Sequence, residues 1–247
     1  KPKYNEQIDS SFVPSIGKKF SIEYPEGTES SGDSGKTTIE IAGFKVKAQE
    51  VGLIKNVTES AHRSSAWIHH PFSGVMGMGF SESSQNHQTT PITNLINNNQ
   101  LDKPEFSFLI GRAKSPSELT IGGSNPKKYD ANTLTFTNVV DDNKGVWKIP
   151  IDNVVINGEK LNLKDRTAII DTGTALIVMP RDDAKEFYSK IPSAKDTGVG
   201  YYMLRCDART RYEIGLEFNG KTWYIDPEDF LIHRVRNSCY GAVTYDN

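Results

Sequence analysis

Residues 168–180 constrain the fold more than any other part of the sequence. They form an apolar run, rich in β-branched residues, that is broken by Asp171-Thr172-Gly173-Thr174. β-Branched residues favour strands, and Gly173 supplies the backbone freedom of a tight turn. The pattern predicts a buried strand entering a sharp turn with Asp171 at its tip, either as a chemical site or as a plain turn between core strands. Because an ionised carboxylate is costly to bury alone, neighbouring hydroxyl and amide groups are its expected partners.

Short alternating runs, separated by glycine, asparagine and proline, occur along the rest of the chain. Residues 18–24 and 37–46 alternate on either side of a polar stretch, which predicts a long hairpin with an exposed tip near residues 24–28. Capped or amphipathic patterns predict short helices at 90–96 and 181–188. Further strands are expected at 72–80, 106–111, 118–123, 134–140, 146–151, 153–157 and within 212–230, with turns at Asn157-Gly158 and Asn219-Gly220. Together these elements predict a mainly β protein.

Length and charge narrow the class of protein. A chain of 247 residues can form one large β domain or two lobes, and the polar turn at 124–128 is the best candidate linker. The net charge of −2, without basic clusters in the sequence, argues against nucleic acid or an anionic membrane surface as the main partner. No apolar run approaches the roughly 20 residues that span a bilayer.

Cys206 and Cys239 are the two cysteines of the chain. They lack CxxC spacing and a nearby histidine pair, so a disulfide explains them better than a metal site. The adjacent His69 and His70 have no partner at helical spacing and no carboxylate-rich setting, which favours surface histidines over zinc ligands. We therefore expect no metal and no cofactor. Asn56-Val57-Thr58 is a glycosylation acceptor pattern, which agrees with a secreted protein.

In their order along the chain, these segments resemble the pepsin-like aspartic proteases, fungal members in particular. Asp171-Thr172-Gly173-Thr174, preceded by Ala-Ile-Ile, matches the second catalytic signature of that family. Residues 20–43 are similar to its flap hairpin, with Tyr24 at the position of the flap tyrosine. Residues 72–79 are similar to the apolar-apolar-Gly segment of its first lobe. The segments 106–123 and 146–149 and the cysteine pair also align.

The resemblance implies a mainly β, bilobal pepsin-like fold with parts of both lobes missing. Residues 1–125 would be the remainder of the N-terminal lobe, carrying the flap, and residues 126–247 the remainder of the C-terminal lobe, carrying the Asp-Thr-Gly loop. The family's first signature is expected before Lys1 and its last apolar-apolar-Gly-Asp segment after Asn247. The chain is thus expected to be trimmed at both ends, with exposed strand edges as sites of association.

The resemblance also implies an aspartic endopeptidase that cleaves proteins or peptides at acid pH. Two aspartates would hold a water and share one proton, because like charges so close together cannot both ionise. One would act as general base on the water and the other would protonate the scissile carbonyl. Asp171 is the implied catalytic residue. Thr172 would bond across the lobe interface, Gly173 would form the turn, and Thr174 would orient the carboxylate.

Substrate contacts are implied at the flap and beside the catalytic loop. Tyr24 would form a wall of the site, the backbone of Glu26, Gly27 and Thr28 would pair with an extended peptide, and Ala175 would line the substrate site. The full enzyme would bind pepstatin-type inhibitors, need no cofactor, and be secreted or vacuolar. With one aspartate of the pair, the isolated chain is expected to be nearly inactive.

Three other interpretations stay open. Asp33-Ser34-Gly35 could replace the first signature or mark a serine protease, but its polar flanks favour a solvated hairpin, and no histidine has the context of a triad member. Two chains could each contribute Asp171, as in retroviral proteases. The chain could also be a non-catalytic peptide-binding or allergen-like protein on the same fold.

Overall fold

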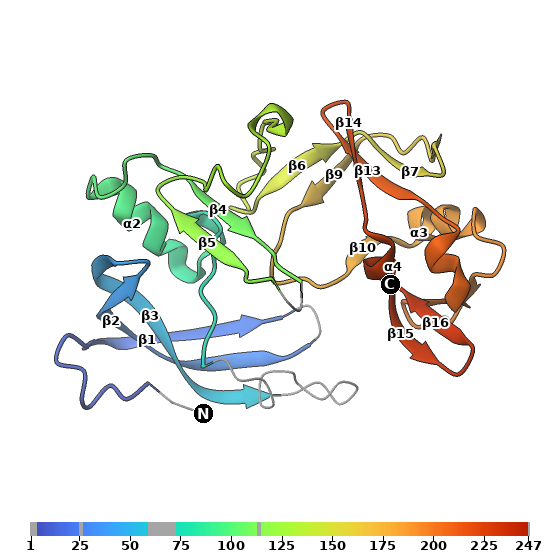
Figure 1. The fold of residues 1–247 in the computed structure, drawn as a ribbon. Helices are drawn as coiled ribbons and strands as arrows, with labels where there is room; N and C mark the ends of the chain where they lie inside the picture. Colours follow the sequence, from blue (N-terminus) through green and yellow to red (C-terminus); the bar gives the residue numbers. More distant parts are fainter. Residues whose placement is uncertain (1–3, 25–26, 59–72, 113–114, 247) are drawn as a thin grey trace. The chain divides into compact units, whose positions relative to one another are not determined.

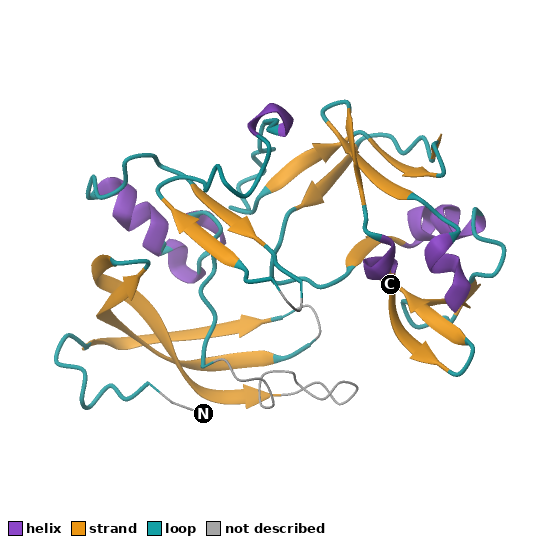
Figure 2. Cartoon of the chain, viewed as in Figure 1, coloured by secondary structure: helices purple, strands orange, loops and turns teal. Residues whose placement is uncertain are grey.

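The computed structural model describes residues 4–24, 27–58, 73–112 and 115–246. The chain forms two compact units, made of Lys1–Leu134 with Asp142–Val146 and of Thr135–Asp141 with Trp147–Asn247 (Figure 1). Strands dominate both units (Figure 2), so the prediction of a mainly β chain is confirmed. Within the described ranges, no helix has the length and apolar character needed to cross a membrane.

A three-stranded antiparallel sheet forms the larger part of the first unit. Its strands are β1 (Val13–Glu23), β2 (Glu29–Ile41) and β3 (Phe44–Thr58), in the order β1-β2-β3. The β1–β2 hairpin closes with Glu23 opposite Glu29, so the long hairpin predicted from the alternating pattern is confirmed. Ala42 and Gly43 join β2 to β3 with φ angles of 50° and 83°, the left-handed conformation of a two-residue hairpin turn.

A small core holds one helix of the first unit against this sheet. Helix α2 (Pro91–Asn97) begins at Thr90, whose hydroxyl oxygen accepts the N–H of Thr93 at 3.3 Å. Buried Gln49 of β3 donates to the carbonyl of Thr89 (3.0 Å) and accepts from Asn94 of α2 (2.7 Å). The core residues are Val46, Ile92, Leu95 and Ile121. The remaining elements are β4 (Phe106–Leu109), β5 (Glu118–Ile121) and the 3-10 turns Ser81–Ser83, Gln85–His87 and Ala131–Thr133.

The second unit contains several small sheets around a larger core. One sheet has the order β14-β13-β7-β8 and another the order β11-β12-β16-β15, while β6 pairs with β9 and β10 pairs in parallel with β17. The bounds are β6 (Lys148–Ile151), β7 (Asn153–Ile156), β8 (Glu159–Lys160), β9 (Arg166–Ile169), β10 (Ile177–Pro180), β11 (Lys195–Asp196), β12 (Tyr202–Arg205), β13 (Ile214–Phe218), β14 (Lys221–Tyr224), β15 (Leu231–Val235), β16 (Ser238–Gly241) and β17 (Val243–Asp246). The helices are α3 (Arg181–Ser189), α4 (Pro227–Phe230) and the 3-10 helix η4 (Cys206–Thr210).

Helix α3 supplies the aromatic centre of this core. It buries Phe187 and Tyr188, and the ring of Tyr188 stacks on that of Tyr202 with centroids 4.1 Å apart. The Tyr188 hydroxyl donates to the carbonyl of Val243 at 2.7 Å, which ties α3 to β17. Burial raises the pKa of Tyr188 above its ordinary value.

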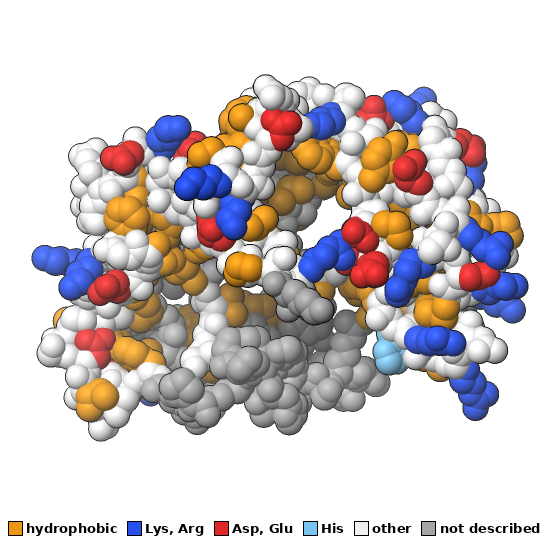
Figure 3. Space-filling view, viewed as in Figure 1, with side chains coloured by type: hydrophobic (Ala, Val, Ile, Leu, Met, Phe, Trp, Pro, Cys, Tyr) orange, Lys and Arg blue, Asp and Glu red, His pale blue; other side chains and the backbone are white. Residues whose placement is uncertain are grey.

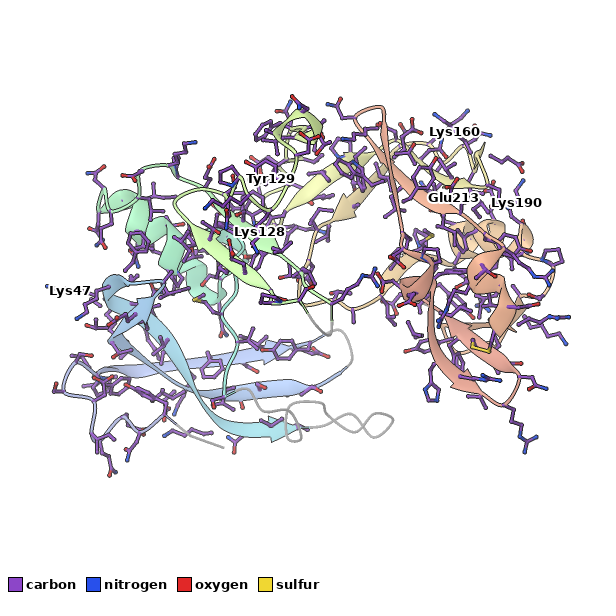
Figure 4. The ribbon with its side chains drawn as sticks, in the orientation of Figure 1. Lys47, Lys128, Tyr129, Lys160, Lys190 and Glu213 are labelled. Atoms are coloured by element: carbon purple, nitrogen blue, oxygen red, sulfur yellow. A yellow bond between two sulfur atoms is a disulfide. The ribbon has the colours of Figure 1, made fainter. Side chains whose placement is uncertain are left out.

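Covalent and ionic links complete the second unit. The predicted disulfide between Cys206 and Cys239 is present and joins η4 to β16 (Figure 4). Lys160 and Lys190, both labelled in Figure 4, pair with Glu217 (2.7 Å) and Glu159 (2.5 Å). The Lys190 pair is exposed, so its net contribution to stability is small.

Two predicted strands are wrong. Residues 73–80 contain no strand, and Phe72 lies outside the described residues; a Cβ on Gly79 would nevertheless lie 2.9 Å from the carbonyl oxygen of Gly145, a close backbone approach. Residues 134–140 are also irregular. Val140 donates to the carbonyl of Lys148 (2.7 Å) and the Asn219 amide donates to the carbonyl of Phe136 (3.2 Å). Isolated bonds of this kind do not build a ladder, which needs repeated pairing with one neighbouring strand.

Candidate active site

The Asp171 loop joins β9 to β10 and is anchored at both ends by neighbouring strands. Before the loop, Ile170 donates its N–H to the carbonyl of Trp147 at 2.9 Å. After it, Ile177 donates to the carbonyl of Ala242 at 3.0 Å, where the parallel pairing of β10 with β17 begins. Two fixed strand ends therefore hold a short loop that carries one carboxylate.

The Asp171 carboxylate is held by its own loop. The N–H of Gly173 donates to Oδ1 at 2.8 Å, and the hydroxyl of Thr174 donates to Oδ2 at 2.5 Å. The expectation that nearby amide and hydroxyl groups pair with this carboxylate is confirmed. Gly173 also allows the tight turn, because a Cβ there would lie 3.1 Å from Asp171 Oδ1. Each carboxylate oxygen keeps further acceptor capacity for a water or a proton.

An ion pair positions the strand that leads into this loop. Arg166, at the start of β9, donates from Nε and Nη2 to the carboxylate of Asp183 on α3, at 2.7 and 3.0 Å. This pairing raises the pKa of Arg166. Since Asp183 is buried, the two-bond geometry fixes β9 relative to α3.

The loop and its flanks are more exposed than the sequence predicts. Asp171, Thr172 and Ala175 are exposed, and Ile169 and Ile170 are 59% and 51% exposed. The prediction of a buried strand around Asp171 is therefore wrong. β9 pairs with β6 alone in the described part of the chain and leaves most of its side chains exposed, whereas β10 packs Ile177 and Met179 against the core of the second unit.

The residues assigned to the flap lie at the β1–β2 turn of the first unit. Tyr24 is half-buried, and its N–H donates to the carbonyl of Thr28 at 2.8 Å, while Gly27 donates to the carbonyl of Tyr24 at 2.7 Å. Gly27 has a φ of 84°, a conformation that glycine adopts readily. Thr28 is buried, and Glu26 lies outside the described residues. A role of this turn in substrate binding stays a prediction.

Asp33 lies on β2, away from any apolar loop. Its carboxylate forms an exposed ion pair with Lys19 of β1. The Lys19 ammonium lowers the pKa of Asp33. This environment is that of a solvated hairpin, as the polar flanks indicate.

A second Asp-Thr-Gly, which the pattern of apolar runs does not single out, occurs at residues 196–198. The local turn is the same, since Gly198 donates to Asp196 Oδ1 at 2.8 Å. The hydroxyl of Tyr245 also donates to Oδ1, at 2.6 Å, and Arg181 Nη2 lies 3.9 Å from Oδ2. The Tyr245 bond, followed by the Gly198 bond, lowers the pKa of Asp196. Asp196 therefore links β11 to β17. The Asp-Thr-Gly tripeptide is the sequence signal that marks this residue as a second candidate.

The remaining site predictions concern glycosylation and metals. Asn56 is exposed on β3, opposite Ser31, and glycosylation there stays a prediction. His69 and His70 lie outside the described residues. Among those that are described, no group of three or more His, Cys, Asp or Glu side chains gathers as a metal site would require.

Comparisons with known proteins match the whole chain. A family profile described as eukaryotic aspartyl protease matches residues 1–247. Rhizopuspepsin-4 of Rhizopus niveus is 28% identical over 246 residues, 98% of the chain and 59% of that protein. An aspartic protease of Phaffia rhodozyma is 31% identical over 245 residues (94% and 57%), and rhizopuspepsin of Rhizopus chinensis is 25% identical over 241 residues (96% and 59%). The chain thus spans about three fifths of the length of these relatives.

Proposed function

Because the chain belongs to the eukaryotic aspartyl protease family, as its segments predicted, we propose that it forms part of an acid endopeptidase in which Asp171 is one of two catalytic aspartates. The observation that supports this best is the Asp171 carboxylate, exposed on a loop and fixed by Gly173 and Thr174. A carboxylate held in this way needs no reorganisation when it binds a water or a proton.

The proposed mechanism uses a pair of aspartates that share one proton. A second carboxylate close to Asp171 would prevent both from ionising together, so the pair would be singly protonated in acid. The ionised member removes a proton from the attacking water, while the protonated member donates to the carbonyl oxygen of the peptide bond. Thr174 keeps the Asp171 carboxylate in one orientation throughout.

We further propose that the β1–β2 hairpin acts as the flap over a protein or peptide substrate. Tyr24 would contact substrate side chains, and the backbone of Glu26, Gly27 and Thr28 would pair with an extended peptide. Thr172 and Ala175 would contact the opposite lobe and the substrate. Residues 1–125 and 126–247 would belong to the two lobes, and the whole enzyme would bind pepstatin-type inhibitors.

Secretion and glycosylation belong to the same proposal. The disulfide between Cys206 and Cys239 favours an oxidising compartment, and Asn56 is exposed within an acceptor tripeptide. A secreted or vacuolar enzyme that carries a glycan on Asn56 accounts for both features. Mass measurement of the natural protein before and after enzymatic deglycosylation tests the glycan.

The 247-residue chain alone should turn over peptides very slowly. Asp171 by itself cannot share a proton with a second catalytic carboxylate, and Asp196 is engaged by Tyr245. The activity of the whole protein therefore has to be measured on the natural protein that contains this chain.

Cleavage of a quenched peptide between about pH 3 and 5 tests the catalytic assignment. In the natural protein, Asp171→Asn should lower kcat by at least about 100-fold, whereas the matched change Asp196→Asn should leave it within about twofold. Equal losses in both variants would remove Asp171 from the catalytic role. A natural protein that binds pepstatin or peptide without cleaving it would instead be a binding protein, and acid activity in a tight dimer of the 247-residue chain would favour two copies each supplying Asp171.

A further inference from the structure

Arginines from two distant segments gather beside the disulfide of the second unit. Arg205, Arg209 and Arg211 lie in or next to η4, and Arg234 and Arg236 lie in or just after β15. The Cys206–Cys239 bridge joins η4 to β16, and β16 pairs with β15 so that Cys239 is opposite Arg234. Figure 3 shows Lys and Arg side chains over the region of the β15–β16 hairpin. The fold thus assembles a basic cluster that the sequence does not show as a run.

Two adjoining hollows open within this cluster. The first, of about 300 Å³, is lined by Arg209, His233 and Arg234 together with Asp207 and Thr210. The second, of about 550 Å³, shares Asp207 and Arg234 with the first and is also lined by Arg205, Asn237 and Ser238. Asp207 is the one acidic side chain among these lining residues, all of which lie in the described part of the chain.

The single carboxylate is already satisfied by its neighbours. Arg205 donates from Nε and Nη2 to the two oxygens of Asp207 at 3.1 and 3.0 Å, and Arg211 adds a bond of 2.7 Å from Nη2. The Arg205 guanidinium, as the largest cause, lowers the pKa of Asp207. Arg234 donates its Nε–H to the carbonyl of Arg236 at 2.8 Å, which is an uncharged acceptor. Positive charge is therefore in excess at the hollows.

Arg209 has an unmet hydrogen-bonding requirement. Its Nε is buried and has no hydrogen-bond partner within the described residues. A buried N–H of a charged group without an acceptor is unfavourable. Arg209 also lines the first hollow, so an anion there would lie beside a guanidinium whose Nε lacks an acceptor and would neutralise the excess charge.

We propose that these hollows bind an oxyanion of the phosphate class, either free inorganic phosphate or a phosphoryl group carried by a peptide. Guanidinium groups match the oxygens of such anions in paired hydrogen bonds, and a doubly charged ion suits several guanidiniums facing one satisfied carboxylate. Asn237 and Ser238 add neutral donors at the edge of the site. This site does not involve Asp171 and is independent of the proposed protease function.

Calorimetric titration of the 247-residue chain with inorganic phosphate at pH 7 and constant ionic strength tests the proposal. We expect saturable binding, with amide NMR shifts confined to residues 205–211 and 231–239. Arg209→Met, which keeps an apolar stem, should weaken phosphate binding at least about tenfold. Arg236→Gln removes the same charge from the neighbouring turn, outside both hollows, and should change the affinity by about twofold. Arg234→Gln provides a second exposed variant, expected to weaken binding, if Arg209→Met does not fold.

Further arms separate the two sources of the anion. Binding of inorganic phosphate and of a phosphoserine peptide, both dependent on Arg209, would show that the phosphoryl group alone is recognised. Binding of the phosphopeptide alone, with none of its unphosphorylated form, would assign the site to a peptide-borne group. Equal weakening by Arg209→Met and Arg236→Gln, or acetate binding as tightly as phosphate, would overturn the proposal.

Discussion

The hydroxyl of Tyr188 provides a sharp test of how the second unit is held together. It donates to the carbonyl of Val243 at 2.7 Å inside the core, where both residues are almost fully buried. Tyr188→Phe keeps the ring and its stacking on Tyr202 but leaves the Val243 carbonyl without this donor. A net buried hydrogen bond and the penalty for an unpaired acceptor together predict a loss of about 1–2 kcal/mol in the free energy of unfolding.

Tyr202→Phe is the matched control for this change. Tyr202 is also buried and is the other member of the stacked pair, but its hydroxyl has no hydrogen-bond partner in the chain as described. Its removal should alter stability by less than about 0.5 kcal/mol. Gly241→Ala perturbs the same hydrogen bond sterically, since its Cβ would lie 2.0 Å from the Tyr188 hydroxyl oxygen. That variant should lose about 1–3 kcal/mol through overpacking, and part of this loss should disappear when Tyr188→Phe is added.

Urea unfolding followed by tryptophan fluorescence measures these differences. Trp147 and Trp223 report on the second unit, and a Trp67→Phe background removes the remaining signal. Equal effects of Tyr188→Phe and Tyr202→Phe, or strictly additive effects of Gly241→Ala and Tyr188→Phe, would contradict the role assigned to the Tyr188 hydroxyl.

Three other outcomes follow from the structure. Burial raises the pKa of Tyr188 above its unfolded value. The stability that protonated Tyr188 contributes is therefore complete below about pH 10 and is lost as the pH rises further. Tyr188→Phe should flatten this alkaline fall in stability, measured by urea unfolding. Hydrogen bonds from Thr37, Tyr4 and Ser11 lower the pKa of Asp9, so its stabilising effect is present above its ordinary unfolded pKa near 4 and is lost progressively as the pH falls from there through the lowered folded value. Asp9→Asn should thus increase proteolytic cleavage near the N-terminus similarly at pH 7 and pH 4. Replacing Cys206 and Cys239 by serine opens a loop with a sequence separation of 33 and should cost about 3–4 kcal/mol of unfolding free energy. A reductant should lower the urea midpoint of the wild type but not that of the variant. Equally small shifts of both midpoints would contradict this prediction.

Local chemistry was enough to predict many elements. Asn157-Gly158 and Asn219-Gly220 form hairpin turns with positive φ at both residues, as their sequences require. Thr90-Pro91 begins α2, and the helix predicted at 181–188 is α3. Each of these signals depends on interactions within a few residues, so no knowledge of distant segments was needed.

The wrong predictions depend on which distant segments pack against a given stretch of the chain. Residues 134–140 have the composition of a strand but no continuous partner. Ile169 and Ile170 are apolar and yet exposed, because periodicity reports the character of side chains and not what covers them. The arginine cluster beside Cys206 depends on a disulfide and a strand pair that bring residues 205–211 to β15, and no local pattern contains that information. Asp196 was missed for a simpler reason, since its tripeptide lacks apolar flanks.

The parallel pairing of β10 with β17 has a consequence for biosynthesis. The strand that leaves the Asp171 loop is paired with residues 243–246, so the loop cannot be fixed on a nascent chain until those residues have emerged from the ribosome. A non-local contact of this kind also slows folding, because the intervening chain must be closed before any stabilisation is gained. The second anchor of the Asp171 loop is thus missing while synthesis proceeds, and it forms only after translation has passed residue 246.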